Sequence, residues 1–350
     1  MRAVAVCSFA VDQCLTLMDH VAPARLELGE YAATVLPALK RAVGFDGWCL
    51  EIADPASGLP MTAEVDNAPL GDRLPEFWRF EFPVGDDARG VWVHPGQVSA
   101  AASRPDPVGT RRFHELLRPG GVADELRSTL VADRLKWGSL ALFRSQGASP
   151  FTEADRGAVA EVLPRLATGA REAWAVSPPG AGERDLVEPG TLLLSSDGAL
   201  ISETAAARLW LAQLAAGYSI IMALVARLGT TRTTSLRTRT RAGIWLRVSG
   251  ARLTPVAGRA SIAITLQPAT PAEVAPLLLR AFGMTPRQRA VAYLVMAGRS
   301  TDQIAAMLRV SPYTVNDHVK ATASRIGVHS RGELVARLSG LPPGTLAPDV

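Results

Sequence analysis

The residues best suited to chemistry lie between Ser311 and Arg325, where polar and apolar side chains alternate at helical spacing. The polar members of this stripe are Tyr313, Asn316, Asp317, Lys320 and Ser324. Apolar Val315, Val319 and Ile326 fall on the opposite face, which should pack inward. Amide, carboxylate and ammonium groups on an exposed helix face can hydrogen-bond the edges of bases in the major groove of DNA. The spacing therefore predicts a helix with one face packed inward and the other able to reach base edges.

Four short helices are predicted around this stripe, because each begins at a recognisable cap. Thr285–Gln288 and Ser300–Gln303 are capping boxes, the first with proline at the first helical position. Ser311 followed by proline and the segment Ser330–Glu333 supply the third and fourth starts. Only the short connection Arg309–Val310 separates the second helix from the third. These helices predict a compact all-α domain.

Positive charge is concentrated in the same region. The whole chain carries a net charge of +4. Between Arg280 and Arg337 there are nine Lys or Arg residues against three acids, so the remainder of the chain is slightly negative. A small domain with an excess of positive charge predicts a polyanionic partner.

The run from Met284 to Leu338 resembles a DNA-binding domain of the LuxR (GerE) type. The resemblance extends over MTPRQRAV, AGRSTDQIAAMLRVSPYTVNDHVK and IGVHSRGELVARL. This chain has Gln288 and Gln303 where the family often has glutamate, and glutamine can make the same reciprocal cap bond. It has Asn316, beside Asp317, where lysine is common, which weakens the attraction to phosphates and leaves the preferred DNA sequence open.

The resemblance implies roles for particular residues. Base contacts are implied for Asn316 to adenine, Asp317 to cytosine N4 and Lys320 to guanine. DNA-backbone contacts are implied for Ser311, Thr314, Arg287, Arg309 and Arg325. The last helix would join two chains through Leu334, Val335 and Leu338. The expected assembly is a homodimer on double-stranded promoter DNA, with RNA polymerase as a further candidate partner.

Two segments rich in proline and glycine, Ser177–Gly190 and Pro268–Pro276, predict linkers between domains. The expected organisation is an N-terminal extension over 1–23, a first module over 24–175, a linker over 176–187, a second module over 188–268, a linker over 269–277, the helical domain over 278–340 and a flexible tail over 341–350.

The first module is predicted to mix helices and strands. Leu26–Val43 has helical apolar spacing, and Asp46–Ile52 and Trp137–Arg144 are typical of strands. A strand followed by Phe151–Asp155 (FTEAD) and a long helix resembles the closing part of GAF domains. The resemblance covers about Ala24–Trp174 and implies a GAF-like sensor.

The second module is also predicted to be α+β. Its expected elements are strands at Thr191–Leu194 and Leu200–Ser202 around a turn at Asp197–Gly198, a helix at Ala205–Leu214, and paired strands at Ile244–Leu253 and Ala260–Leu266. This order resembles a PAS domain over about Val187–Gln267. The expected fold is therefore multidomain, with two α+β sensor modules before an all-α four-helix domain.

Two other groups of residues each allow two interpretations. The tract Thr230–Arg241 alternates arginine with threonine, as in a second nucleic-acid patch or in a strand with one solvated face, and we favour the strand. Trp48, Trp78, Trp92 and Trp137 could line a ligand pocket, but aromatic residues in α+β domains are more often part of the core.

Catalytic signatures are missing from the sequence, which contains neither a phosphate-binding loop nor a nucleophile elbow. The five histidines are scattered, so no metal or cofactor is expected, and His318 should touch backbone or phosphate instead. An enzyme built on the GAF-like fold is therefore a remote alternative.

The cellular setting expected from the sequence is a reducing cytoplasm. The three cysteines, Cys7, Cys14 and Cys49, lack C-x-x-C spacing. No apolar run reaches the ~18 residues of a membrane span, and the N-terminal apolar run lacks a convincing cleavage site. We expect a sequence-specific transcription regulator that responds to an unidentified signal. The alternative is a regulator that acts through protein contacts with a degenerate helix-turn-helix, which Asn316 and Asp317 leave open.

Overall fold

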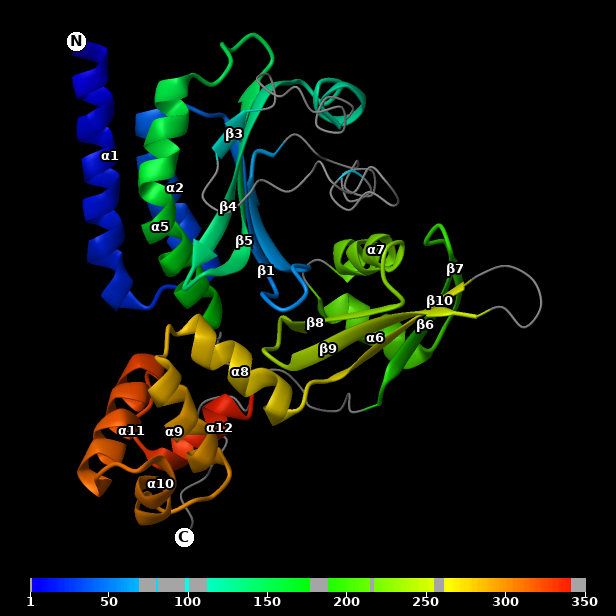
Figure 1. Cartoon of the computed structure of the whole chain (residues 1–350). Helices are drawn as coiled ribbons and strands as arrows, with labels where there is room; N and C mark the ends of the chain where they lie inside the picture. Colours follow the sequence, from blue (N-terminus) through cyan, green and yellow to red (C-terminus); the bar gives the residue numbers. More distant parts are fainter. Residues whose placement is uncertain are drawn as a thin grey trace.

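The protein was studied as a computed structural model, which describes residues 2–68, 80, 98–100, 112–176, 188–214, 217–254 and 261–340. Figure 1 shows an N-terminal part with a sheet and long helices, a middle part with a second sheet, and a C-terminal helical bundle. The predicted multidomain layout is confirmed at this level. Trp78, Trp92, most of the predicted linker 176–187 and the predicted tail 341–350 lie outside the described residues.

The N-terminal part is an antiparallel sheet with three helices on one face (Figure 1). Its strands are β1 (Gly47–Ala53), β2 (Pro60–Asp66), β3 (Val98–Ala100), β4 (Val122–Ala132) and β5 (Leu135–Ser145), in the order β2-β1-β5-β4-β3. The helices are α1 (Arg2–Val21), α2 (Leu28–Val43) and α5 (Glu153–Ala175), with a 3-10 turn η1 (Ala22–Ala24) and a π-helical turn η5 (Phe113–Leu117). Thr152 and Asp155 form a capping box that fixes the start of α5.

The expected N-terminal extension belongs to this core. Helix α1 packs against α2 and α5, and its Cys14 and Met18 are buried among their apolar side chains. Trp48 and Trp137 are also buried there, as predicted for core aromatics. Helix α1 and the turn η1 are therefore integral to the N-terminal part rather than an extension from it.

The middle part repeats the same strand order. Its strands are β6 (Gly190–Ser195), β7 (Leu200–Glu203), β8 (Thr233–Arg239), β9 (Trp245–Leu253) and β10 (Ser261–Pro268), in the order β7-β6-β10-β9-β8. Helices α6 (Ala205–Gln213) and α7 (Gly217–Leu228) share a core with one face of this sheet, around Trp210, Leu246 and Ile264. Within the described ranges no single helix is long and apolar enough to cross a membrane; α6 and α7 meet that criterion only jointly, and they are bent by 111°.

The predicted linker over 269–277 is wrong, because most of it is the start of helix α8 (Pro271–Ala281). Thr270 and Glu273 form a capping box, with proline at the first helical position. Val274 and Leu278 are fully buried, and α8 contacts both α5 and α12 (Figure 1). The segment is therefore a packed connector between the sheets and the bundle.

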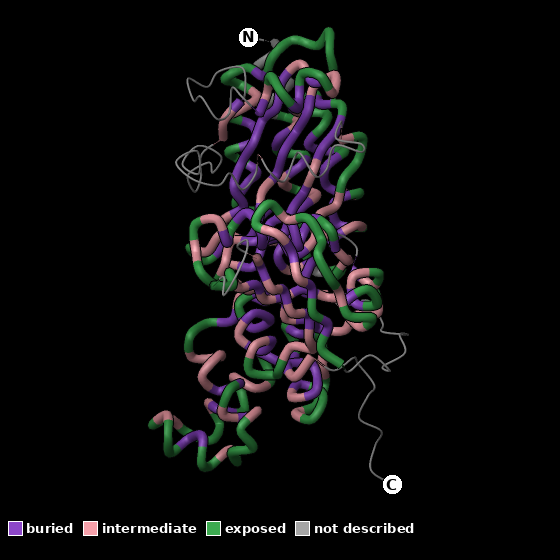
Figure 2. Tube along the Cα trace, turned by 90° about the vertical axis from the view of Figure 1, so that its right-hand side faces the viewer, coloured by how far each residue is buried: buried purple, intermediate pink, exposed green. Residues whose placement is uncertain are grey.

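The C-terminal bundle contains α9 (Pro286–Met296), α10 (Thr301–Leu308), α11 (Pro312–Ile326) and α12 (Arg331–Leu338). Each begins at its predicted cap, and the side chains of Thr285, Ser300, Ser311 and Ser330 accept backbone N–H bonds. A small core of its own surrounds Ile304 and Val315. Figure 2 shows buried residues running through the sheets into the bundle, whose outer end is mostly exposed.

Candidate nucleic-acid interface

The outer face of α11 carries the predicted polar stripe. Tyr313 is 75% exposed, and Asn316, Asp317 and Lys320 are all exposed. On the inner face Val315 is fully buried and Ile326 is nearly so. The two-sided helix predicted from the spacing is therefore confirmed, and its polar face is open to a partner.

A tight turn sets α11 against α10. Arg309 ends α10 in the left-handed conformation, with φ of 54°, and the Val310 N–H donates to the Ala305 carbonyl at 3.0 Å. Next, the Thr314 N–H donates to Ser311 Oγ at 3.1 Å and so caps α11. Arg287 of α9 donates to the Leu308 carbonyl at 2.5 Å, which ties the first helix to this turn. Two helices joined so closely, with the second one polar outward, have the geometry of a helix-turn-helix.

Three of the predicted DNA-backbone contacts gather at the beginning of α11. Arg309 and Ser311 are exposed and Thr314 is half-buried. The positive end of the helix dipole lies at the same place, which favours a phosphate. Arg287 is half-buried beside them through its bond to the Leu308 carbonyl.

Arg325 lies at the opposite end of α11 and faces the N-terminal part. Its Nη2 atom lies 3.3 Å from Glu172 Oε1 on α5. Arg25, which follows η1, donates to the Ser324 carbonyl and, at 2.8 Å, to the Arg325 carbonyl. In this arrangement Arg325 is engaged by a carboxylate, unlike the other predicted backbone contacts. Sequence reasoning missed Arg25, whose partners are about 300 residues away in the chain.

The predicted dimerisation helix α12 is packed inside the chain. Leu334 and Leu338 are fully buried, and Val335 is half-buried. Arg337 of α12 donates to the Ala175 carbonyl at the end of α5 at 2.9 Å. A second chain could reach Leu334 and Leu338 only after α12 leaves this position.

The arginines of β8 are not on a solvated face. The strand itself is confirmed, but the Arg237 guanidinium pairs with Asp54 and the Arg239 guanidinium lies 5.3 and 5.2 Å from the rings of Trp174 and Trp245. Burial, together with the nearby Arg337, lowers the pKa of Arg239 from its ordinary value to about 9. The alternation of arginine and threonine therefore marks a contact between parts of the chain.

In the portion of the chain that the structure describes, no group of three His, Cys, Asp or Glu side chains could bind a metal ion. His318 is half-buried on α11, next to the exposed Asp317.

A four-helix bundle in which a tight turn joins the second helix to a third helix with an exposed polar face has the architecture of a helix-turn-helix domain. Residues 283–338 match the family described as bacterial regulatory proteins, luxR family (GerE). The chain therefore carries a LuxR-type helix-turn-helix domain, which suggests DNA-binding transcription regulation.

Solved structures of LuxR-type proteins are similar to this chain at low identity. Escherichia coli SdiA aligns over 93% of this chain and 97% of its own, at 13% identity and a TM-score of 0.34. Vibrio cholerae VqmA, described among LuxR-type receptors, aligns over 43% of this chain and 81% of its own, at 12% identity and a TM-score of 0.21. A VqmA–ligand–DNA complex aligns over 45% of this chain and 86% of its own, at 17% identity and a TM-score of 0.22. No curated protein gives a significant match to the sequence.

Proposed function

We propose that this chain is a sequence-specific DNA-binding transcription regulator, with α11 as its recognition helix. The observation that carries the proposal is the exposed stripe of Asn316, Asp317 and Lys320 on the outer face of α11, within a LuxR-type domain. These three side chains contact base edges, while Arg309 and the start of α11 contact phosphates.

The N-terminal and middle parts are proposed to be GAF-like and PAS-like sensor modules. Their two sheets share one strand order, which supports a common plan. Both parts contact α8, the helix that leads directly into the bundle, through α5 and through Arg237 of β8. A signal that changes either part can therefore act on the DNA-binding domain.

Regulation is proposed to work through docking of the bundle. In the docked arrangement Arg325 is paired with Glu172, and Leu334 and Leu338 are buried. Release would free Arg325 for a phosphate and α12 for a second chain. The resulting homodimer would contact two half-sites about one helical turn, roughly 34 Å, apart on DNA.

The proposal is tested by selecting duplexes from a randomised pool with the full chain at two salt concentrations. Lys320→Ala is compared with Lys40→Ala, which removes the same charge from an exposed position on α2. We expect the wild type and Lys40→Ala to enrich one paired motif, and Lys320→Ala to bind that motif about tenfold more weakly.

Two outcomes would overturn this proposal. One is equal enrichment by both variants, which would remove Lys320 from the base contacts. The other is weak binding that enriches no motif and disappears at higher salt, because counterion release alone accounts for such binding. The second outcome would favour a regulator that acts through protein contacts.

A further inference from the structure

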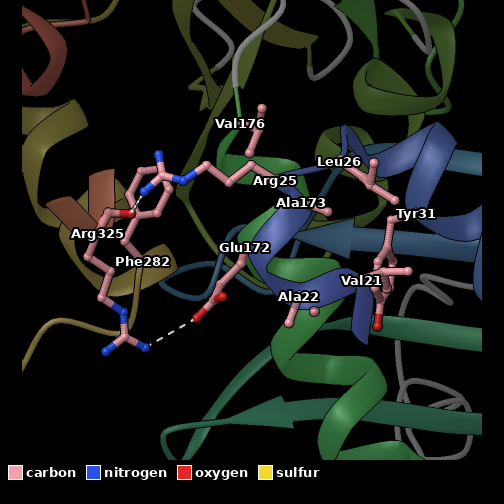
Figure 3. A pocket seen from close by; sticks show the side chains of 11 residues that line it. Val21, Ala22, Arg25, Leu26, Tyr31, Glu172, Ala173, Val176, Phe282 and Arg325 are labelled. Atoms are coloured by element: carbon pink, nitrogen blue, oxygen red, sulfur yellow. Dashed lines mark hydrogen bonds and ion pairs between the residues drawn. The ribbon is translucent and has the colours of Figure 1, made fainter. Parts of the chain in front are cut away.

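A cavity lies where the N-terminal part meets the bundle (Figure 3). Its volume is about 190 Å³. The residues that matter for the argument come from both sides: Ala22, Arg25 and Tyr31 from η1 to α2, Glu172 from α5, and Phe282 and Arg325 from the bundle and its connector. Because one buried water needs only ~10–15 Å³, this cavity has room for a small organic molecule.

Tyr31 gives the cavity a polar group in need of a partner. The side chain is 3% exposed, and its hydroxyl makes no hydrogen bond within the described part of the chain. Gly169 leaves room for this hydroxyl, because a Cβ there would lie 2.2 Å from Tyr31 Oη. An unsatisfied buried hydroxyl carries a free-energy cost, because it has lost its hydrogen bonds to water without replacing them. A ligand atom that accepts from Tyr31 would remove this cost.

The arginines on the side of the cavity opposite Tyr31 favour the binding of an anion. Figure 3 shows Arg25, Arg325 and Phe282 on one side of the cavity, Tyr31 and Leu26 on the other, and Glu172 between them. Glu172 is the acid among the lining residues, and it already lies 3.5 Å from Arg171 and 3.3 Å from Arg325. Among the described residues Arg25 donates to the Ser324 and Arg325 carbonyls and takes part in no ion pair. Two exposed arginines, Arg25 and Arg325, therefore line the cavity, and of the two Arg325 is the one paired with a carboxylate.

We propose that this junction cavity binds a small organic carboxylate with an apolar body. The carboxylate lies against Arg25 and Arg325, the body packs between Leu26 and Phe282, and Tyr31 donates to a polar atom at the inner end. Because the walls come from both sides of the junction, the bound molecule stabilises the docked bundle and lowers DNA affinity. This last consequence rests on the proposed function, whereas binding itself does not.

Titration calorimetry on the full chain tests the site without DNA. The probes are 4-hydroxyphenylacetate, phenylacetate, which lacks the hydroxyl group, and 4-hydroxyphenylacetamide, which lacks the charge. We expect 4-hydroxyphenylacetate to bind with at least about tenfold higher affinity than the amide, because a charge-assisted bond is lost in the amide. Phenylacetate should fall between the two. Absence of measurable heat for both acids at millimolar concentration would overturn the proposal.

Matched variants locate the binding. Arg25→Gln should weaken binding of both acids at least about tenfold, while Arg165→Gln, an exposed change on α5, leaves it unaltered. Ala22→Phe should fill the cavity and abolish binding, whereas Ala24→Phe, two residues away and outside the lining, should not. Binding that is the same in Arg25→Gln and Ala22→Phe as in the wild type would place the acids elsewhere and overturn the proposal.

Tyr31→Phe separates a ligand contact from a structural role. Removing the unpaired hydroxyl should raise the urea midpoint of the free protein and reduce affinity for 4-hydroxyphenylacetate to that of phenylacetate. Unchanged affinity in this variant would remove Tyr31 from the site. In a separate titration with the enriched duplex, 4-hydroxyphenylacetate should lower DNA affinity. Binding of the acid without that change would support the site and overturn its coupling to DNA.

Discussion

Arg237 of β8 and Asp54, the residue after β1, form a two-point ion pair that joins the middle part to the N-terminal part. Arg237 Nη2 lies 2.6 Å from Asp54 Oδ1, and Nε lies 2.8 Å from Oδ2. The remaining nitrogen, Nη1, donates to the Glu273 carbonyl of α8 at 3.0 Å. One guanidinium thus connects both sheets to the helix that leads into the DNA-binding domain.

Breaking this pair should destabilise the protein strongly. Asp54 is 1% exposed, so Asp54→Ala leaves Arg237 without its counter-charge in a mostly buried site. We expect a loss of about 3 kcal/mol in the free energy of unfolding. A double-mutant cycle with Arg237→Ala in urea unfolding measures the coupling. The exposed pair Arg165–Asp19, 3.0 Å apart, is the control and should couple by less than about 1 kcal/mol. Equal coupling in the two cycles would contradict the prediction.

The helix-turn-helix could be predicted because its determinants are local in sequence. Each of the four cap side chains accepts from a backbone N–H three residues further along the chain. The apolar spacing of α11 identifies its buried face. The strands β5, β6 and β9 were also predictable from short apolar runs between turns. In each case the interactions that determine the element lie between residues close together in the sequence.

Helix α8 was missed although its cap was present. The prolines of Pro268–Pro276 favoured a linker, and Pro276 does remove one backbone donor inside the helix. Burial of Val274, Leu277 and Leu278 outweighs that loss. Helix α8 packs against α5 and α12, and no local sequence pattern identifies these two helices as its partners.

Contacts between distant segments could not be predicted at all. Arg237 and Asp54 are 183 residues apart in sequence, and Arg25 and Arg325 are 300 apart. An arginine in an alternating strand usually faces solvent, and its acidic partner here comes from another part of the chain. The same limit applies to Leu334 and Leu338, whose burial depends on the position of the whole bundle.

Glu172→Gln should raise the DNA affinity of the full chain. The substitution removes the charge that engages Arg325 at 3.3 Å and leaves the side chain similar in shape. Because partly exposed pairs are worth about 0.5–1 kcal/mol, we expect a gain of about two- to fivefold in equilibrium binding of the enriched duplex. Glu161→Gln makes the same change at an exposed position of α5. It should raise DNA affinity only by the effect of removing one negative charge from the protein. An identical response of the two variants would exclude the proposed role of Glu172.

Arg309→Gly should separate stability from DNA binding. Arg309 has φ of 54°, a left-handed conformation that glycine adopts without the Cβ strain. We expect the free energy of unfolding of the variant to rise by about 1 kcal/mol, measured in urea. Its affinity for DNA should nevertheless fall. Losing one phosphate contact should also reduce the slope of log affinity against log salt by about 0.9. Arg299→Ala removes an exposed charge between α9 and α10 and is the control for net charge. The same salt slope in both variants would remove Arg309 from the DNA contacts.

Cys14 should make the protein less stable at alkaline pH. Burial raises the pKa of its thiol to about 11 from 9.0, with a smaller opposing effect from Arg41. Between these two values the unfolded chain releases a proton that the folded chain retains, so the free energy of unfolding falls as pH rises above about 9. From about pH 7 to about pH 10 the wild type should lose about 1 kcal/mol more than Cys14→Ala in urea unfolding. Burial, the largest cause of the raised pKa of Tyr31, is common to both proteins, whereas the smaller contribution of the Cys14 charge is present in the wild type alone. Parallel pH profiles for the two proteins would show that the Cys14 thiol is not the group that titrates.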